Sequence, residues 1–123
     1  MKFSFALPNT VQLKALGNDW ERSVDGAAQT AMAKRADALG YDMVSVPEHF
    51  LIPNEHIELS GAHYFDSATG MAYLAGATDQ IRVNSCLTIL TLHNPVLLAK
   101  ALSTIDFMSG GRVTCTFGVG WLK

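Results

Sequence analysis

Histidine and glutamate gather in one stretch of the sequence, EHFLIPNEHIELSGAHYF, at residues 48–65. His49, His56 and His63 are spaced seven residues apart in it. A histidine side chain exchanges a proton near neutral pH, so His49 is our candidate for proton transfer or for holding a substrate oxygen. Histidine and carboxylate also suit zinc, but no pair has the spacing of the HExxH helix motif. We therefore expect no metal site, and a metal-dependent hydrolase is the less favoured alternative.

The neighbours of His49 in this stretch are candidates for substrate contacts. Glu48 would orient His49 or contact the substrate, and His63 and Tyr64 would line a pocket for an apolar substrate. Structureless loops longer than about 12–15 residues are usually functional or disordered, and this one has too many apolar residues for disorder. We expect an irregular lid or binding loop here.

The segments around this loop alternate between strand and helix patterns. Strands are expected to begin near residues 2, 41, 81 and 112, which is the rhythm of parallel βαβ units with right-handed crossovers. Two architectures share it: an open doubly wound sheet and one half of a (β/α)₈ barrel. A half barrel would leave an open strand edge on each side.

Three helices connect the expected strands. The first runs from Ser23 to Leu39, the second begins at Asp66 or Ser67, and the third has Asn94 as its N-cap and Pro95 in its first turn. The residues expected on the buried face of the first helix are Val24, Ala27, Ala28, Ala31, Ala38 and Leu39. Those expected on the buried stripe of the third are Leu98, Ala101, Leu102, Ile105 and Met108.

The composition indicates one packed globular domain of 123 residues, 49% hydrophobic and 16% charged. A net charge of -2 gives no reason to expect nucleic acid or a charged membrane as a partner. Cys86 and Cys115 both lie in expected strands and are interpreted as buried thiols. With no signal-peptide pattern and no apolar stretch long enough to span a membrane, we expect a cytoplasmic protein.

Residues 94–121, NPVLLAKALSTIDFMSGGRVTCTFGVGW, resemble the bacterial luciferase-like family of flavin- and deazaflavin-dependent oxidoreductases. MKFSFALPN and GYDMVSVPEHF are similar to the first two strands of that family. The resemblance implies an α/β fold, the luciferase-like (β/α)₈ TIM barrel, of which residues 1–123 would be the N-terminal half with strands 1–4 and helices 1–3. The chain would then be a fragment whose partner is the missing C-terminal half or a further copy in a homo-oligomer.

The same resemblance implies a cofactor, FMN or coenzyme F420, and hydride transfer or monooxygenation of a small organic substrate. His49 would lie close to the reactive atom of the cofactor ring. Cys86, Leu87 and Thr88 would support the back of the ring at a bulge with a cis peptide bond between Cys86 and Leu87, although an ordinary buried strand is the alternative. The glycine-rich end, Gly118, Val119 and Gly120, would flank the ring or form a plain turn. A non-catalytic, self-associating half barrel is a second interpretation of the whole chain.

Overall fold

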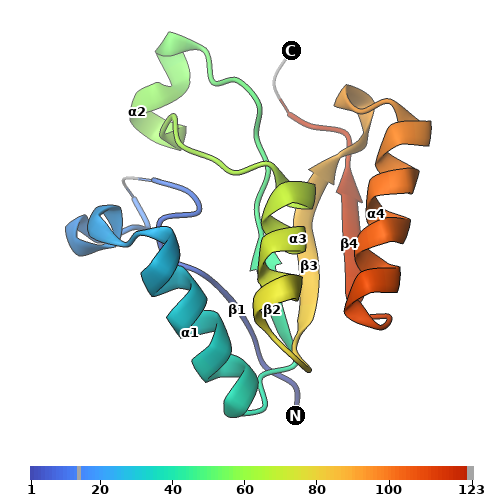
Figure 1. The fold of residues 1–123 in the computed structure, drawn as a ribbon. Coiled ribbons are helices and arrows are strands. Elements are labelled where there is room, and N and C mark those ends of the chain that lie inside the picture. Colours follow the sequence, from blue (N-terminus) through green and yellow to red (C-terminus); the bar gives the residue numbers. More distant parts are fainter. Residues whose placement is uncertain (14, 122–123) are drawn as a thin grey trace.

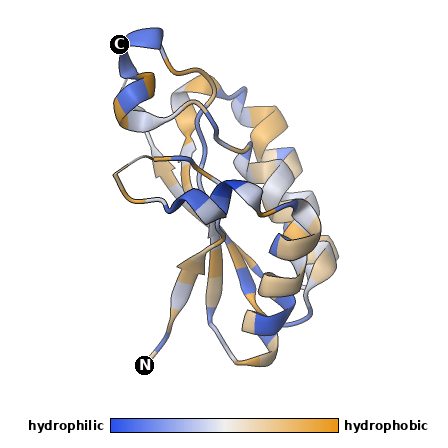
Figure 2. Cartoon of the chain, turned by 90° about the vertical axis from the view of Figure 1, so that its left-hand side faces the viewer, coloured by the Kyte–Doolittle hydropathy of each residue, from blue (hydrophilic) through white to orange (hydrophobic). Residues whose placement is uncertain are grey.

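Parallel strands and helices alternate along the chain in this computed structural model, which describes residues 1–13 and 15–121. Within these residues, four parallel strands form one sheet in the order β1 (Ser4–Ala6), β2 (Met43–Val46), β3 (Arg82–Ile89) and β4 (Val113–Gly118). The strands are connected through helices α1 (Gly26–Ala38), α3 (Ser67–Ala77) and α4 (Pro95–Ser109). These helices lie on one face of the sheet (Figures 1 and 2). The predicted α/β alternation is confirmed.

The start of α3 and both ends of α4 form where the sequence predicts them, because local capping residues are present. The predicted start of the first helix at Ser23 is wrong, because α1 begins at Gly26 after the Asp25 cap. The Asp66 carboxylate accepts a hydrogen bond from the backbone N–H of Thr69 (2.7 Å). The Asn94 side chain accepts from two backbone N–H groups in the first turn of α4, which begins with Pro95. Gly110 ends α4 in the left-handed conformation (φ 72°), which costs glycine little.

The hydrophobic core lies between the sheet and the helices and includes Val44, Val83 and Met71, all fully buried. The buried face predicted for the first helix holds for Val24, which lies just before α1 and is buried. It is wrong for Ala27, Ala31, Ala38 and Leu39, which are exposed, because the buried residues of α1 are Gln29, Ala33 and Ala36. Alanines lie on every side of this helix, so periodicity alone cannot select its buried face.

The prediction for α4 holds for Leu98 and Ile105, which are buried. It is wrong for Met108, whose side chain is 81% exposed. Met108 borders the open groove between α3 and α4, beside Ala72 and Thr104. Among the described residues no further strand pairs with β1 or β4, and both sheet edges are open.

Residues 48–65 are more ordered than predicted. They contain a 3-10 turn, Asn54–His56, and a single helical turn, α2 (Ile57–Ser60). Gly61 stops α2 with a φ of 69°, and a side chain there would overlap the carbonyl oxygen of Gln12. The segment therefore packs closely against the chain that follows β1.

Hydrogen bonds of Asp37 and Arg112 stabilise the end of the sheet where the strands begin. The Asp37 carboxylate accepts hydrogen bonds from backbone N–H groups that lead into β3, including that of Ile81 (2.8 Å). Burial alone would raise the pKa of Asp37, but these N–H groups and the nearby Arg112 guanidinium hold it below its ordinary value. Arg112 donates in turn to the carbonyl oxygens of Ala75 (2.7 Å) and Thr78 (3.0 Å) at the end of α3.

The face of the sheet opposite the helices is polar. Arg82 donates to the Thr114 hydroxyl (2.6 Å), and the Asn84 amide lies 3.2 Å from the Ser45 hydroxyl. A parallel sheet with helices on one face only is the arrangement of part of an α/β barrel, whose helices form an outer ring. None of the described helices combines the length and the apolar content that crossing a membrane requires.

Candidate functional site

The β3 bulge, residues 85–89, interrupts the regular pairing of β3 with β4. The peptide bond between Cys86 and Leu87 is cis, as the family resemblance implied. The register shifts between Cys86 and Thr88, so Leu87 is an extra residue between two paired ones. Cys86 and Leu87 are both exposed, and the prediction of a buried thiol is wrong for Cys86. Thr88 is fully buried, and its hydroxyl lies 3.2 Å from that of Ser67.

His49 lies at the same end of the sheet as the β3 bulge, the end where the strands finish, because Val46 at the end of β2 is aligned with Ser85 of β3. Its ring centroid lies 5.2 Å from that of Tyr64 and 6.0 Å from that of Trp121. The Nδ1 atom of His49 is buried and has no hydrogen-bond partner among the described residues. Buried polar atoms are normally paired, so this nitrogen is available to a ligand.

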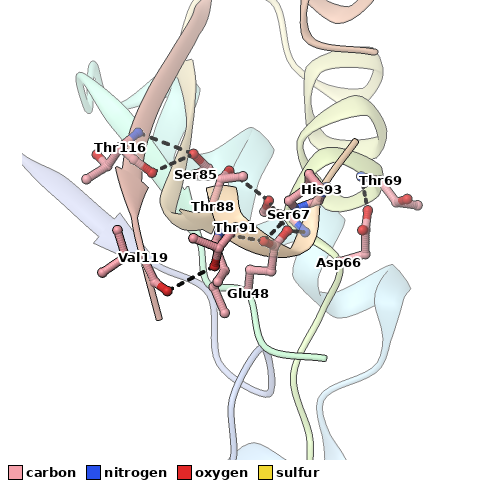
Figure 3. Close-up of polar contacts among 11 residues, drawn as sticks. Glu48, Asp66, Ser67, Thr69, Ser85, Thr88, Thr91, His93, Thr116 and Val119 are labelled. Carbon is pink, nitrogen blue, oxygen red and sulfur yellow. Dashed lines mark hydrogen bonds and ion pairs between the residues drawn. The ribbon is translucent and has the colours of Figure 1, made fainter. Parts of the chain in front are cut away.

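The Glu48 carboxylate connects three segments of the chain (Figure 3). It accepts hydrogen bonds from the Ser67 hydroxyl (2.6 Å) and from the backbone N–H of Ile89 (2.8 Å), and it lies 2.9 Å from Nε2 of His93. Burial alone would raise the pKa of Glu48, but these hydrogen bonds outweigh burial and hold the pKa below its ordinary value. Both oxygens are thus engaged within the protein, and the substrate contact by Glu48 stays a prediction.

The glycine-rich end of β4 packs against the bulge. A side chain at Gly118 would lie 2.6 Å from Cδ1 of Leu87, so Leu87 fills the room that this glycine leaves. The carbonyl oxygen of Val119 accepts a hydrogen bond from the Thr91 hydroxyl (3.0 Å). These contacts fasten the end of β4 to β3, and cofactor contacts by Gly118, Val119 and Gly120 stay a prediction.

Tyr64 and His63 occupy different surroundings. The Tyr64 ring faces His49, its hydroxyl donates to the Ser60 carbonyl oxygen (2.7 Å), and burial raises the pKa of Tyr64. Nε2 of His63 lies 2.9 Å from the Asn9 carbonyl oxygen. Tyr64 therefore shares the site with His49, whereas His63 ties the loop to the segment after β1. Their contacts with a substrate stay predictions.

The remaining histidine of the loop, His56, lies against Trp121 and not against His49 or His63. The His56 and Trp121 ring centroids lie 5.6 Å apart with an interplanar angle of 70°. Among the described residues, no group of three or more His, Cys, Asp or Glu side chains could hold a metal ion. The geometry thus gives no support to a metal-dependent hydrolase.

Sequence reasoning missed two residues of this site, Ser67 and His93. The sequence pattern marks Ser67 only as a possible helix cap and does not single out His93. The one available signal was Glu48 itself, because an acidic residue at the end of a buried strand needs nearby donors. Sequence position does not identify those donors, since they come from other elements.

A protein-family comparison extends these observations. The pattern of the luciferase-like monooxygenase family matches residues 1–123. The chain belongs to this family. Its recognition from the sequence is confirmed, and so is the barrel-type α/β fold.

Relatives in this family include a dehydrogenase and a monooxygenase. An F420-dependent glucose-6-phosphate dehydrogenase from Amycolatopsis mediterranei is 35% identical over 89 residues, which are 72% of this chain and 26% of that protein. The monooxygenase RslO1 from Streptomyces bottropensis is 28% identical with a TM-score of 0.73, covering 99% of this chain and 34% of that one.

A more distant structure shares the fold. The oxygenating constituent of 3,6-diketocamphane monooxygenase from Pseudomonas putida, in complex with FMN, has a TM-score of 0.69 at 17% identity, covering 99% of this chain and 30% of that one. The present chain therefore spans only about a quarter to a third of the length of these relatives.

Proposed function

We propose that this chain carries part of the active site of an oxidoreductase that uses coenzyme F420 or FMN, with hydride transfer between the cofactor ring and a small organic substrate. The observation that carries the proposal is that the β3 bulge and the buried Nδ1 of His49, which has no hydrogen-bond partner among the described residues, lie at the same end of the sheet. Family membership supports it, because the relatives include dehydrogenases and monooxygenases.

The residues at this end of the sheet fit the flat ring of such a cofactor. The cofactor, when bound, supplies the redox chemistry, including oxygen activation where it is FMN. The exposed side chains of Cys86 and Leu87 would support one face of the ring, and Val119 would flank it. His49 would hold a substrate oxygen or exchange a proton with it through Nδ1.

The surroundings of His49 suit this role. The rings of Tyr64 and Trp121 cover the imidazole and would keep water away from Nδ1. We further propose that the protein acts in the cytoplasm on a small molecule and not on nucleic acid or a membrane. The small net charge of -2 supports this choice of partner.

The test is an equilibrium titration of the purified protein with coenzyme F420 and, separately, with FMN, followed by the absorbance or fluorescence of the ring. Saturable binding of one of them is expected. Leu87→Glu should weaken that binding at least about tenfold, because it places a charge where the apolar ring would lie. Leu39→Glu is the matched control, since Leu39 is exposed at the other end of the sheet. Binding of neither cofactor would overturn the proposal.

One observation favours the second candidate, a self-associating half barrel. Large apolar side chains are exposed beside both open edges: Phe107 (88%) and Val96 (74%) on α4, and Phe3 (56%) before β1. Exposed apolar surface of this kind typically marks an interaction site. Light scattering after size exclusion, over a range of concentrations, should show dimers that Phe107→Glu dissociates if this candidate is correct. A monomer at every concentration would exclude it.

A further inference from the structure

We propose that Glu48 and His93 are positioning residues, whose hydrogen bond holds the β3 bulge in the geometry that the cofactor ring requires. This inference rests on the proposed function, because it concerns the same ring site. It assigns a role to His93, which lies outside the 48–65 loop and whose Nε2 atom lies 2.9 Å from the Glu48 carboxylate.

Glu48 controls one side of the bulge directly (Figure 3). Its carboxylate accepts the backbone N–H of Ile89 at 2.8 Å. It also accepts the Ser67 hydroxyl at 2.6 Å, and that hydroxyl lies 3.2 Å from the hydroxyl of Thr88. This carboxylate therefore holds the last two residues of the bulge, Thr88 and Ile89, in addition to their pairing with β4.

The other side of the bulge is fixed separately. The Ser85 hydroxyl lies 3.3 Å from both the carbonyl oxygen and the backbone nitrogen of Thr116 in β4. Cys86 and Leu87, which would face the ring, thus lie between a β4 anchor and the Glu48 anchor. Loss of either anchor would let these two residues move while the rest of the sheet stays paired.

His93 decides whether the Glu48 anchor stays in place. The Glu48 side chain is only 1% exposed and that of His93 15%, so water is a poor substitute for their 2.9 Å contact. The His93 ring is held by an edge contact with Phe50, whose centroid lies 5.3 Å away. A buried carboxylate that loses a donor is costly and will rotate toward another donor or toward water. Movement of the carboxylate would release the N–H of Ile89.

The role of Glu48 is specific to the site, because a different carboxylate, Asp37, stabilises the other end of β3. At the opposite end of β3, the Asp37 carboxylate accepts the backbone N–H groups of Asp79 (2.6 Å) and Ile81 (2.8 Å). Both carboxylates hold the same strand through backbone N–H groups. Only Glu48 does so at the bulge, and Asp37 is therefore the matched control.

The experiment compares His93→Leu with His93→Gln in the full chain. His93→Leu removes the donor, and we expect it to weaken binding of coenzyme F420 or FMN, whichever binds the unaltered protein, at least about tenfold. His93→Gln keeps an N–H that can reach the carboxylate, and binding should stay within about threefold. Hydrogen exchange should become at least about tenfold faster in residues 85–92 of His93→Leu only, and stay unchanged in residues 105–117.

The control and the contrary results are distinct. Asp37→Asn should lower the free energy of unfolding and leave the cofactor dissociation constant unchanged. Equal binding and exchange in His93→Leu and the unaltered protein would overturn the positioning role, as would a His93→Gln variant as impaired as His93→Leu. Should His93→Leu not fold, Glu48→Gln applies the same test, with faster exchange at residues 85–92 expected. If the unaltered protein binds neither cofactor, the proposed function fails, and hydrogen exchange alone decides whether His93 holds the bulge.

Discussion

The rings of His49 and Trp121 lie with their centroids 6.0 Å apart and their planes at 75°. His49 follows β2 and Trp121 follows β4, so this contact brings together the ends of two strands that are not neighbours in the sheet. The surroundings of the candidate acid–base residue therefore depend on the end of β4 as well as on its own loop. The two imidazoles that approach Trp121 both come from residues 48–65.

Replacement of His49 should separate chemistry from cofactor binding. We expect His49→Gln to lower turnover about 10²-fold or more, because the amide cannot exchange a proton, while cofactor affinity changes by no more than about threefold. The measurement is the single-turnover absorbance change of the bound cofactor with a substrate that supports turnover. Glu55→Gln, an exposed change in the same loop, is the control. Unaltered turnover in His49→Gln with cofactor bound would remove His49 from the mechanism.

The protein should lose stability in acid through Glu48 and Asp37. The pKa of each carboxyl is lower in the folded chain than in the unfolded one. Each therefore contributes stability at any pH above its unfolded pKa, and this stability is lost as the pH falls through its folded pKa. The free energy of unfolding in urea should therefore decrease from about pH 5 downward.

Glu48→Gln should make this decrease smaller, because glutamine does not titrate. Its free energy of unfolding should already be lower at pH 7, where the ionised carboxylate is missing. If the unaltered protein and Glu48→Gln have parallel pH profiles, the hydrogen bonds to Glu48 do not favour its ionised form.

Gly118→Ala should disturb the bulge through one neighbour. The added methyl group would meet Leu87 at 2.6 Å, and we expect a loss of about 1–3 kcal/mol in the free energy of unfolding. Leu87→Ala removes the atoms involved, so the double variant should recover most of the loss caused by the glycine change. Urea unfolding of the four proteins in a double-mutant cycle gives the coupling energy. Strict additivity would show that the two positions do not interact.

Gly61→Ala should loosen residues 48–65 more than a glycine change usually does. Gly61 has a φ of 69°, and a side chain there would overlap the carbonyl oxygen of Gln12. Limited proteolysis should cut this loop faster, and the melting temperature should fall. Gly76→Ala is the matched control, because open space surrounds that position in α3. Alanine there should raise the free energy of unfolding by at most about 1 kcal/mol. Equal protease resistance of the two variants would contradict the observed packing.

Local signals and family resemblance predicted different parts of this structure. The start of α4 at Asn94 and Pro95 and its end at Gly110 could be read from the sequence, because capping acts within one turn. The cis bond between Cys86 and Leu87 came from the family resemblance, since no local residue pattern requires it.

The remaining features depend on contacts between distant segments. Glu48 meets His93 only because the ends of β2 and β3 lie side by side, which no local pattern encodes. The exposure of Met108 depends on how α4 packs beside α3, because Met108 borders the open groove between them. Cys86 is exposed because it lies with Arg82 and Asn84 on the face of the sheet opposite the helices, and a strand pattern alone does not show which face the helices cover.

The central claim is that the cofactor ring lies on the β3 bulge, and the alkylation rate of Cys86 measures this most directly. Cys86 is free and exposed, whereas burial raises the pKa of the half-buried Cys115 thiol and makes it a slower internal control. The two rates follow from mass spectrometry after iodoacetamide treatment, with and without a saturating concentration of the cofactor that binds. We predict that the bound cofactor slows alkylation of Cys86 at least about tenfold and leaves Cys115 unchanged. An unchanged Cys86 rate with the cofactor bound would place the ring elsewhere and contradict the account.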